Sequence, residues 1–149
     1  MCLFTDASDT HWSIILTQAP KGSLCTSKLE VHDLPHETLA FISGAFHSSE
    51  LKRSTLEKEA YPIILALTRL RHFLLNGFRI LCDHRNLSYI FSPFKERKQT
   101  REKLARCCDH LLSFNNLIEH ISGIDNIWDD LMTRWGSSSE CLNSIVRSQ

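Results

Sequence analysis

FRILCDHRNL, residues 78–87, is the stretch that decides the fold, because an apolar run ends there in a single acidic residue. The apolar residues 78–82 predict a buried strand, and residues 84–91 predict a short helix that ends before Ser92-Pro93. Asp83 is therefore expected at the carboxyl edge of a strand. A lone aspartate there is more often a helix cap or turn residue than a catalyst, so its role depends on which other carboxylates join it.

Length and composition indicate one soluble globular domain. The chain has 149 residues, of which 42% are hydrophobic and 23% charged, and no apolar run approaches the roughly 18 residues of a membrane span. Basic and acidic residues both number 17, so the zero net charge neither favours nor excludes a polyanionic partner. The chain begins abruptly in a strand-like run without a signal-peptide pattern, which suggests a piece of a longer protein.

The six cysteines predict reduced thiols rather than disulfides or a zinc site. They include no Cys-x-x-Cys pair, and no secretion signal accompanies them. Cys107 and Cys108, near His110, lack the spacing of zinc knuckles and fall on a helical pattern, so core packing is the preferred interpretation. His32 and His36 have helical ligand spacing but flank a proline that argues against a helix, which indicates surface-loop histidines.

Hydrophobic patterns predict an α/β order of strands and helices. Apolar runs predict strands at 2–5, 12–18, 39–46, 78–82 and 116–121. Gly44 suggests a bulge in the third of these strands. Apolar residues at steps of three and four predict helices at 54–75, 84–91, 95–112 and 127–135. The Ser-rich residues 136–149 predict a linker or a frayed end.

The first turn of the longest predicted helix separates two glutamates. Ser54-Thr55-Leu56-Glu57 has the spacing of a capping box, in which Glu57 binds the backbone of its own first turn. Glu59 has no such role and borders the apolar stripe, so we expect its carboxylate to point toward the sheet, with a solvated glutamate as the alternative. Pro62 removes a helical hydrogen bond at a cost of roughly 3 kcal/mol, which predicts a kink or a delayed helix start.

Four acidic residues are expected at comparable points around one sheet edge. Asp6 and Asp83 end strands, Glu59 lies in a helix packed on the sheet, and Asp130 opens the last predicted helix, where dipole complementation is the simpler explanation. Clustered carboxylates repel one another unless cations neutralise them, and Mg²⁺ prefers carboxylate oxygens together with phosphates and water. The pattern predicts a two-metal site, in which ions roughly 3.5 to 4 Å apart hold the attacking water and the leaving oxygen of a phosphodiester.

A basic run lies between the predicted short helix and the last strand. Its cations are Lys95, Arg97, Lys98, Arg101, Lys103 and Arg106, against only two glutamates. A basic run is commonly a solvated helix face, but it can also follow a phosphate backbone. The sequence favours these two interpretations equally.

Four motifs together resemble one family. FTDAS (4–8), STLEKEA (54–60), DHRNL (83–87) and IEHISGIDNIWDDL (118–131) match, in order and spacing, the ribonuclease H domain of gypsy-type LTR retrotransposon Pol polyproteins. The resemblance spans about residues 3–135 and implies a ribonuclease H-like domain at 1–135, with a mixed five-stranded sheet flanked by helices, followed by the tail at 136–149. It also implies an endoribonuclease that hydrolyses the RNA strand of RNA/DNA hybrids within a reverse transcriptase.

The resemblance assigns the metal ligands and the partners. It implies two Mg²⁺ ions, with Mn²⁺ as a substitute, held by Asp6, Glu59, Asp83 and Asp130. The capping-box argument agrees in preferring Glu59 to Glu57. The implied partners are the hybrid and the polymerase portion of the same polyprotein, without a membrane, and the isolated domain is expected to be a monomer inside the cell, in a virus-like particle or the nucleus.

Further site residues follow from the same resemblance. His120 lies ten residues before Asp130, the spacing of the mobile catalytic histidine of related retroviral domains, although an outward-facing strand histidine is an equal alternative. The hybrid is expected to be recognised by shape, through contacts from Arg85, Asn86, Lys98 and Arg101. Because the net charge is zero, we expect weak independent binding that tethering to a polymerase compensates.

Two residues depart from the family pattern. Pro62 replaces a helix-forming position just after Glu59, and Cys107 stands where many relatives have tryptophan, which thins the core. The alternative function is therefore a catalytically inactive retroelement remnant that serves as a structural or nucleic-acid-binding module. A transposase or integrase of related fold is a weaker alternative, because those enzymes use a different acidic pattern.

Overall fold

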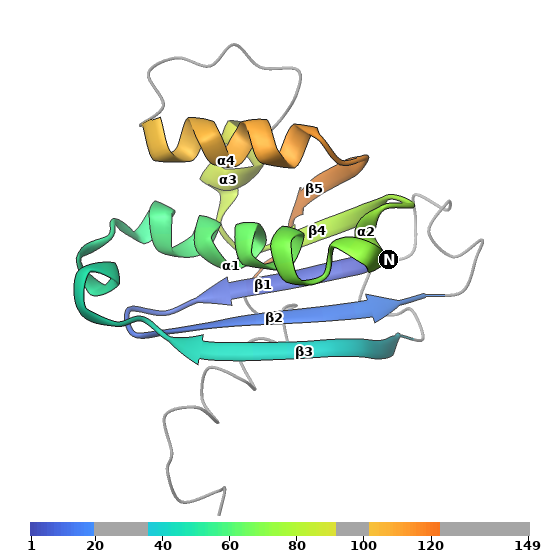
Figure 1. Cartoon of the computed structure of the whole chain (residues 1–149), viewed down its shortest axis with the longest axis horizontal. Helices are drawn as coiled ribbons and strands as arrows, with labels where there is room; N and C mark the ends of the chain where they lie inside the picture. Colours follow the sequence, from blue (N-terminus) through green and yellow to red (C-terminus); the bar gives the residue numbers. More distant parts are fainter. Residues whose placement is uncertain (20–35, 92–101, 123–149) are drawn as a thin grey trace, which may run out of the picture.

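The computed structural model describes residues 1–19, 36–91 and 102–122 (Figure 1). The elements are β1 (Cys2–Ala7), β2 (His11–Gln18), β3 (Glu37–Ala45), the 3-10 helix η2 (Ser48–Lys52), α1 (Thr55–Arg69), α2 (Arg71–Leu74), β4 (Phe78–Cys82), α3 (Arg85–Ile90), α4 (Glu102–Leu112) and β5 (Asn116–His120). The helix predicted at 127–135 and the tail lie outside the described residues. None of the helices in the described ranges is long and apolar enough to span a membrane.

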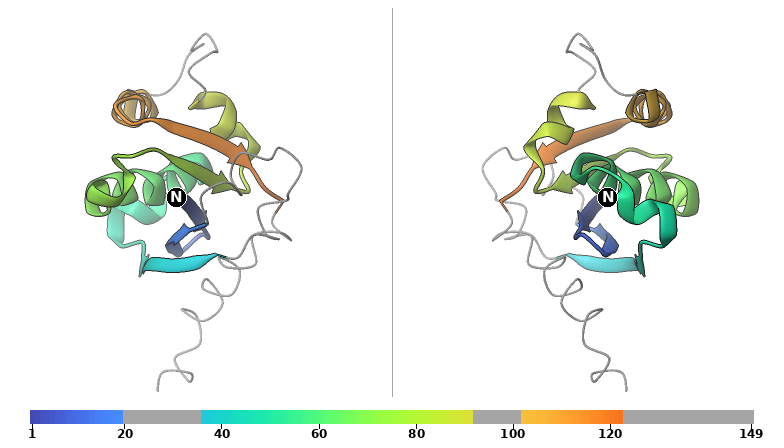
Figure 2. Two further views of the ribbon diagram at one scale, coloured as in Figure 1. Left: turned by 90° about the vertical axis from the view of Figure 1, so that its right-hand side faces the viewer. Right: turned by 90° about the vertical axis from the view of Figure 1, so that its left-hand side faces the viewer.

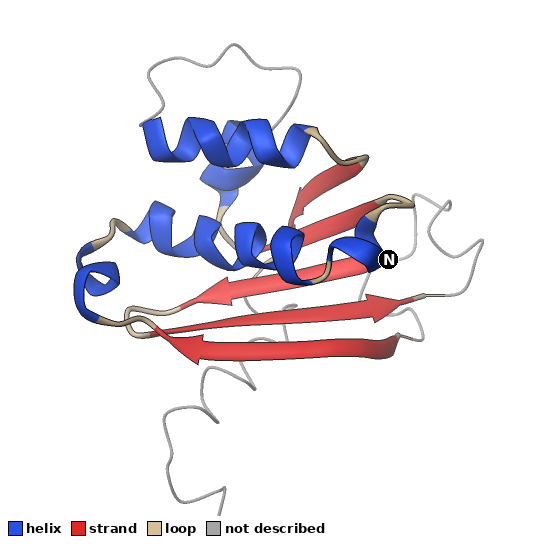
Figure 3. Ribbon diagram, viewed as in Figure 1, coloured by secondary structure: helices blue, strands red, loops and turns tan. Residues whose placement is uncertain are grey.

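The five strands form one mixed sheet in the order β3-β2-β1-β4-β5 (Figure 3). β1, β2 and β3 pair antiparallel, whereas β1 with β4 and β4 with β5 are parallel. The parallel register matches Leu3 with Ile80 and Phe4 with Leu81. Carried two residues further, the same offset matches Asp6 with Asp83. Parallel pairing thus brings both acids to one edge of the sheet, and the predicted mixed five-stranded sheet is confirmed.

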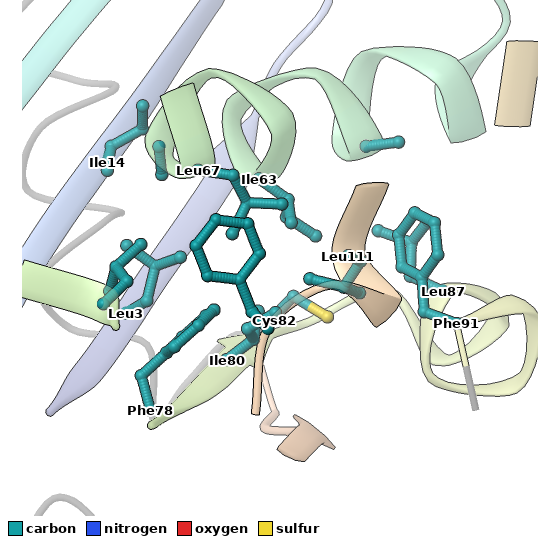
Figure 4. Packing of buried hydrophobic residues seen from close by; sticks show 14 of the residues in the cluster. Leu3, Ile14, Ile63, Leu67, Phe78, Ile80, Cys82, Leu87, Phe91 and Leu111 are labelled. Carbon is teal, nitrogen blue, oxygen red and sulfur yellow. The ribbon is translucent and has the colours of Figure 1, made fainter. Parts of the chain in front are cut away.

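The apolar face of α1 covers the centre of the sheet (Figures 1 and 2). Its buried residues Ile63 and Leu67 belong to one core cluster with Leu3 and Ile80 of the strands, and α3 and α4 extend this cluster toward β5 (Figure 4). Side chains that alternate with these along β1, β2 and β4 form a second buried cluster of Cys2, Phe4, Ile15 and Leu81. The central strands are therefore buried on both faces.

The long helix predicted at 54–75 is two helices. α1 ends at Arg69 and α2 begins at Arg71. Between them Leu70 leaves helical geometry, with φ of −109° and ψ of 16°, while its side chain stays in the core. The apolar spacing continues across this break, which explains why the pattern predicts a single helix. Gly77 then ends the segment with a φ of +92°, a conformation that favours glycine.

The start of α1 has the predicted capping box. Ser54 Oγ accepts the N–H of Glu57 at 3.3 Å, and Glu57 Oε2 accepts the N–H of Ser54 at 2.9 Å. The predicted delayed start is wrong, because these bonds begin the helix at Thr55, well before Pro62. Pro62 is buried inside α1 and has no N–H to donate to the carbonyl of Lys58.

Gly44 lies in regular strand pairing rather than in a bulge. It pairs with Trp12, and the shift in the β2–β3 register falls between Leu16 and Thr17. A Cβ on Gly44 would lie 2.5 Å from Trp12 Cζ2. The predicted bulge is therefore wrong. A glycine is required at this position because the indole ring of Trp12 occupies the space where a Cβ would lie.

The described cysteines are free, as predicted, and one histidine differs from its prediction. Cys2, Cys82 and Cys108 are buried thiols in the core. His36 lies just before β3, outside any helix or strand as predicted, but it is half-buried rather than exposed, and His32 lies outside the described residues. Its Nδ1 lies 2.9 Å from Thr17 Oγ1, and its ring packs edge-to-face on a phenylalanine of β1.

A pocket of about 180 Å³ lies between α1 and α4. Its lining includes Ile64 of α1, and Leu104 and Cys107 of α4. Burial raises the pKa of the Cys107 thiol, so this side chain behaves as a small neutral group. The space beside it is consistent with the predicted thinning of the core at a position where tryptophan is common.

Replacing Gly44 with alanine is expected to destabilise the domain by roughly 1 to 3 kcal/mol, because the added Cβ displaces Trp12 or shifts the strand pairing. Urea unfolding followed by circular dichroism measures this change. Ser43→Ala, at the neighbouring exposed position of β3, is the matched control and should change the free energy of unfolding by less than about 0.5 kcal/mol. Equal stabilities of Gly44→Ala and wild type would contradict the packing explanation.

Replacing Cys107 with tryptophan is expected to raise the free energy of unfolding by about 1 kcal/mol, since the ring buries apolar surface in the pocket. The same substitution at the adjacent Cys108, which is 2% exposed, should destabilise the domain by overpacking. Thermal unfolding compares the two variants. A lower Tm for Cys107→Trp would mean that the pocket does not accept the ring.

Candidate metal centre

Three carboxylates of the described structure converge at one edge of the sheet. Asp6 comes from β1, Glu59 from the second turn of α1, and Asp83 from the residue that follows β4. One carboxylate oxygen of each lies within 4.8 Å of those of the other two. Glu59 is buried, whereas Asp6 and Asp83 are half-buried. We call these three residues the carboxylate cluster.

The capping box explains why Glu59 rather than Glu57 joins the cluster. Glu57 is held at the start of α1 by the backbone N–H and the hydroxyl of Ser54. Two residues further along a helix, a side chain lies on roughly the opposite side, and Glu59 therefore points toward the sheet. Its 6% exposure confirms the predicted orientation and excludes the solvated alternative.

The pKa of the Cys82 thiol is raised at this edge of the sheet. Burial raises the pKa of Cys82 to about 12, and the charges of Glu59 and Asp83 add to the rise, against a backbone hydrogen bond from His84 that lowers it. The ligand atoms that converge in the described structure belong to Asp6, Glu59 and Asp83 and not to Cys82, so the donor set consists of hard carboxylate oxygens. Such a set fits Mg²⁺ or Mn²⁺ better than it fits zinc.

Three other predicted site residues lie near the cluster in the fold. Arg85 and Asn86 are exposed in the first turn of α3, directly beyond Asp83. His120 is half-buried at the end of β5, where the strand register matches it with Cys82. The group of converging carboxylates does not include His120, so its role as a proton shuttle stays a prediction.

The remaining predicted residues lie outside the described ranges. These are Asp130, Lys98 and Arg101. Of the basic run, α4 contains Lys103 and Arg106, both exposed, and Arg106 forms an ion pair with Glu102 one turn earlier. The described part of the run is thus a solvated helix face, and the phosphate-binding interpretation stays a prediction.

Lys58 is a residue near the cluster that the sequence patterns do not single out. Its ammonium donates to the main-chain carbonyl of Asp9 at 2.8 Å and lies 3.4 Å from Asp9 Oδ1. The one available signal is its place beside the apolar stripe of α1. Lysines at such places commonly extend to solvent, so the signal is weak.

Comparison with known proteins identifies the family. The model of the RNase H-like domain found in reverse transcriptase matches residues 1–114. The chain belongs to this family. It also resembles the enzymatic polyproteins of Figwort mosaic virus and Carnation etched ring virus, with 23% identity over 131 and 129 residues. These matches cover 87% and 86% of the chain but only 18% of each polyprotein, so the chain spans less than a fifth of their length.

Several solved structures share the fold of this RNase H-like domain. LC11-RNase H1 in complex with an RNA/DNA hybrid has a TM-score of 0.62 at 16% identity, over 87% of this chain and 90% of that one. RNase H1 of the archaeon Halobacterium salinarum has a TM-score of 0.59 at 12% identity, over 87% and 91%. A foamy viral protease-reverse transcriptase in complex with an RNA/DNA hybrid has a TM-score of 0.54 at 16% identity, over 82% and 15%. These matches confirm the predicted fold class.

Replacing Asp83 with asparagine is expected to raise the Tm of the metal-free protein, because it removes one of three mutually repelling charges. The same variant should lose most of the thermal stabilisation that millimolar Mn²⁺ gives the wild type. Calorimetric scans in EDTA and in Mn²⁺ measure both effects.

Asp109→Asn, on the exposed face of α4, makes the same change of charge away from the cluster and serves as the control. It should keep the shift in Tm that Mn²⁺ causes. An equal Mn²⁺-dependent shift in Asp83→Asn and wild type would show that the cluster is not a metal site.

Proposed function

We propose that this chain is the ribonuclease H domain of a gypsy-type retrotransposon reverse transcriptase, which hydrolyses the RNA strand of RNA/DNA hybrids. The convergence of Asp6, Glu59 and Asp83 at one sheet edge carries the proposal. Family membership supports the class of enzyme, and the four sequence motifs support the gypsy type. The proposed domain spans residues 1–135, with residues 136–149 as a linker or tail.

The carboxylate cluster, with Asp130 as a fourth ligand, is proposed to hold two Mg²⁺ or Mn²⁺ ions. When bound, such ions activate a water molecule and neutralise charge on the phosphodiester. The residues of the chain supply the oxygen ligands and keep them together, since Asp6 and Asp83 are joined through strand pairing and Glu59 through the packing of α1. His120, in the neighbouring strand, is proposed to transfer protons at the same edge.

The substrate proposal rests on the residues that surround the cluster. Arg85 and Asn86 are exposed directly beyond Asp83, within reach of a backbone that passes over the cluster, and Lys98 and Arg101 would add contacts to phosphates. Complexes of LC11-RNase H1 and of the foamy viral enzyme contain an RNA/DNA hybrid, which supports the same substrate here. The polymerase portion of the same polyprotein would supply most of the affinity, because tethering raises the effective concentration of the substrate.

An inactive remnant is the second candidate function, and two structural observations favour it. Pro62 lies inside α1 only three residues after Glu59, and the pocket beside Cys107 weakens the packing of α1 on α4. In this alternative, one or both features would let Glu59 move out of the carboxylate cluster. A remnant of this kind would bind hybrid without cleaving it.

The test is cleavage of a labelled RNA/DNA hybrid in Mg²⁺, by the chain alone and by the chain fused to a reverse-transcriptase polymerase. RNA cleavage that leaves 3′ hydroxyl and 5′ phosphate ends is expected, with a rate at least about 100-fold lower in Asp83→Asn. Asp109→Asn should retain the wild-type rate. Cleavage that survives Asp83→Asn, or no cleavage in either format, contradicts the proposal, and hybrid binding without cleavage favours the remnant.

A further inference from the structure

We propose that Lys58 is a positioning residue, which ties the turn after Asp6 to the turn of α1 that carries Glu59 and so keeps both carboxylates in place for metal binding. The inference rests on the proposed function of the carboxylate cluster. It concerns a residue outside the carboxylate cluster, which acts through Glu59, its neighbour in α1, and through the turn that follows Asp6.

The surroundings of Lys58 are unusual for a helical lysine. Its side chain is only 9% exposed. Burying an ammonium group is unfavourable unless hydrogen bonds replace its water, and here the ammonium donates to the carbonyl of Asp9 at 2.8 Å. The ring of Phe46 lies below it, 5.9 Å from the ammonium to the ring centroid, and adds a cation–π contact. The side chain is therefore held in one place.

The acceptor lies in the short turn between β1 and β2, three residues after Asp6. Ser8 stiffens this turn, because its hydroxyl accepts the N–H of His11 at 2.9 Å and its own N–H donates to the carbonyl of His11 at 2.8 Å. Because the turn is held by these bonds, a hydrogen bond that fixes Asp9 also restrains the end of β1, where Asp6 lies. The hydrogen bond thus joins two segments 49 positions apart, each next to one of the carboxylates.

The main-chain carbonyl, rather than the carboxylate of Asp9, carries this link. The Asp9 side chain is 97% exposed and its nearer oxygen lies 3.4 Å from the ammonium, so water screens that ion pair. The bond to the carbonyl is shorter, at 2.8 Å, and is partly buried. Removal of the Asp9 side chain should therefore leave the link intact.

Pro62 makes the hydrogen bond of Lys58 more important for the geometry of α1. A proline cannot donate to the carbonyl four residues earlier, which here belongs to Lys58, so α1 lacks one backbone bond across the turn that contains Glu59. Loss of such a bond makes that turn easier to distort. The side chain of Lys58 restrains the same turn from outside the helix and compensates for the proline.

Lys58→Met tests the link, since methionine retains much of the apolar stem but removes the ammonium donor. We expect Mn²⁺ affinity, measured by isothermal titration calorimetry, to fall roughly tenfold, the usual effect of losing a residue that orients a metal ligand. Simple electrostatics predicts the opposite sign, because removal of a nearby positive charge strengthens cation binding. A purely structural role would lower Tm and leave Mn²⁺ affinity unchanged, so unchanged or tighter binding overturns the proposal.

Three further variants complete the experiment. Asp9→Ala should change Mn²⁺ affinity less than about twofold, because the carbonyl acceptor remains. Lys58→Gln, too short to reach the carbonyl, should reproduce the loss and replaces Lys58→Met if that variant does not fold. In a Pro62→Ala background, Lys58→Met should lose clearly less affinity than in the wild-type background. Equal losses in the two backgrounds would overturn the compensation for Pro62.

The outcomes also separate this inference from the proposed function. A wild-type protein that binds no Mn²⁺ refutes the metal site, and the positioning role falls with it. If the wild-type protein binds Mn²⁺ and both Lys58 variants bind it equally tightly, the positioning role is refuted but the metal site is not.

Discussion

The parallel pairing of β1 with β4 is the constraint on which the rest of the site depends. An antiparallel arrangement would place the carboxyl ends of β1 and β4 at opposite edges of the sheet. The parallel register, continued two residues beyond Phe4 and Leu81, instead brings Asp6 and Asp83 to the same edge, where their carboxylates converge. Burial of both faces leaves these strands little freedom to slide, because a shift of one residue would exchange their two apolar faces. The core of the domain thereby holds two negative charges together against their repulsion.

Helix α1 adds the third charge through a different kind of constraint. Its rotation about its own axis follows from the capping box at Ser54 and from the apolar stripe that packs on the sheet. Once both are satisfied, Glu57 is occupied at the helix start and Glu59 faces the strand ends. The position of Glu59 thus follows from helix capping and apolar packing rather than from attraction among the three carboxylates, and the repulsion within the carboxylate cluster is a cost that a bound cation would offset.

Sequence patterns predict those features that local spacing decides. The strand at 78–82, the capping box and the orientation of Glu59 all follow from periodicity and cap chemistry, and the structure contains them. The four motifs add, through resemblance to a family, a mixed five-stranded sheet flanked by helices, but not the order of its strands. Helix ends and side-chain roles that depend on residues distant in sequence are predicted poorly, because a single sequence does not reveal which residues come into contact.

Gly44 and Lys58 illustrate the difference. Gly44 has the local signature of a bulge, but the reason for the glycine is an indole ring on the neighbouring strand. Lys58 has the local signature of a solvated lysine, but its partner is a carbonyl 49 positions earlier. The sequence pattern does not reveal the helix break at Leu70 for a related reason. The Leu70 side chain continues the apolar spacing of the helix, whereas its backbone leaves helical geometry.

The place of β1 in the sheet also has a consequence for the order of folding. β1 comes before the other described strands in the sequence, yet it is the central strand of the sheet, and its partner Ile80 is 77 positions from Leu3. The antiparallel meander of β1, β2 and β3 forms from contacts that are near in sequence, but the pairing that unites Asp6 with Asp83 must wait for β4 and closes a long loop. The acidic centre therefore cannot form before β4 has been made and has paired with β1.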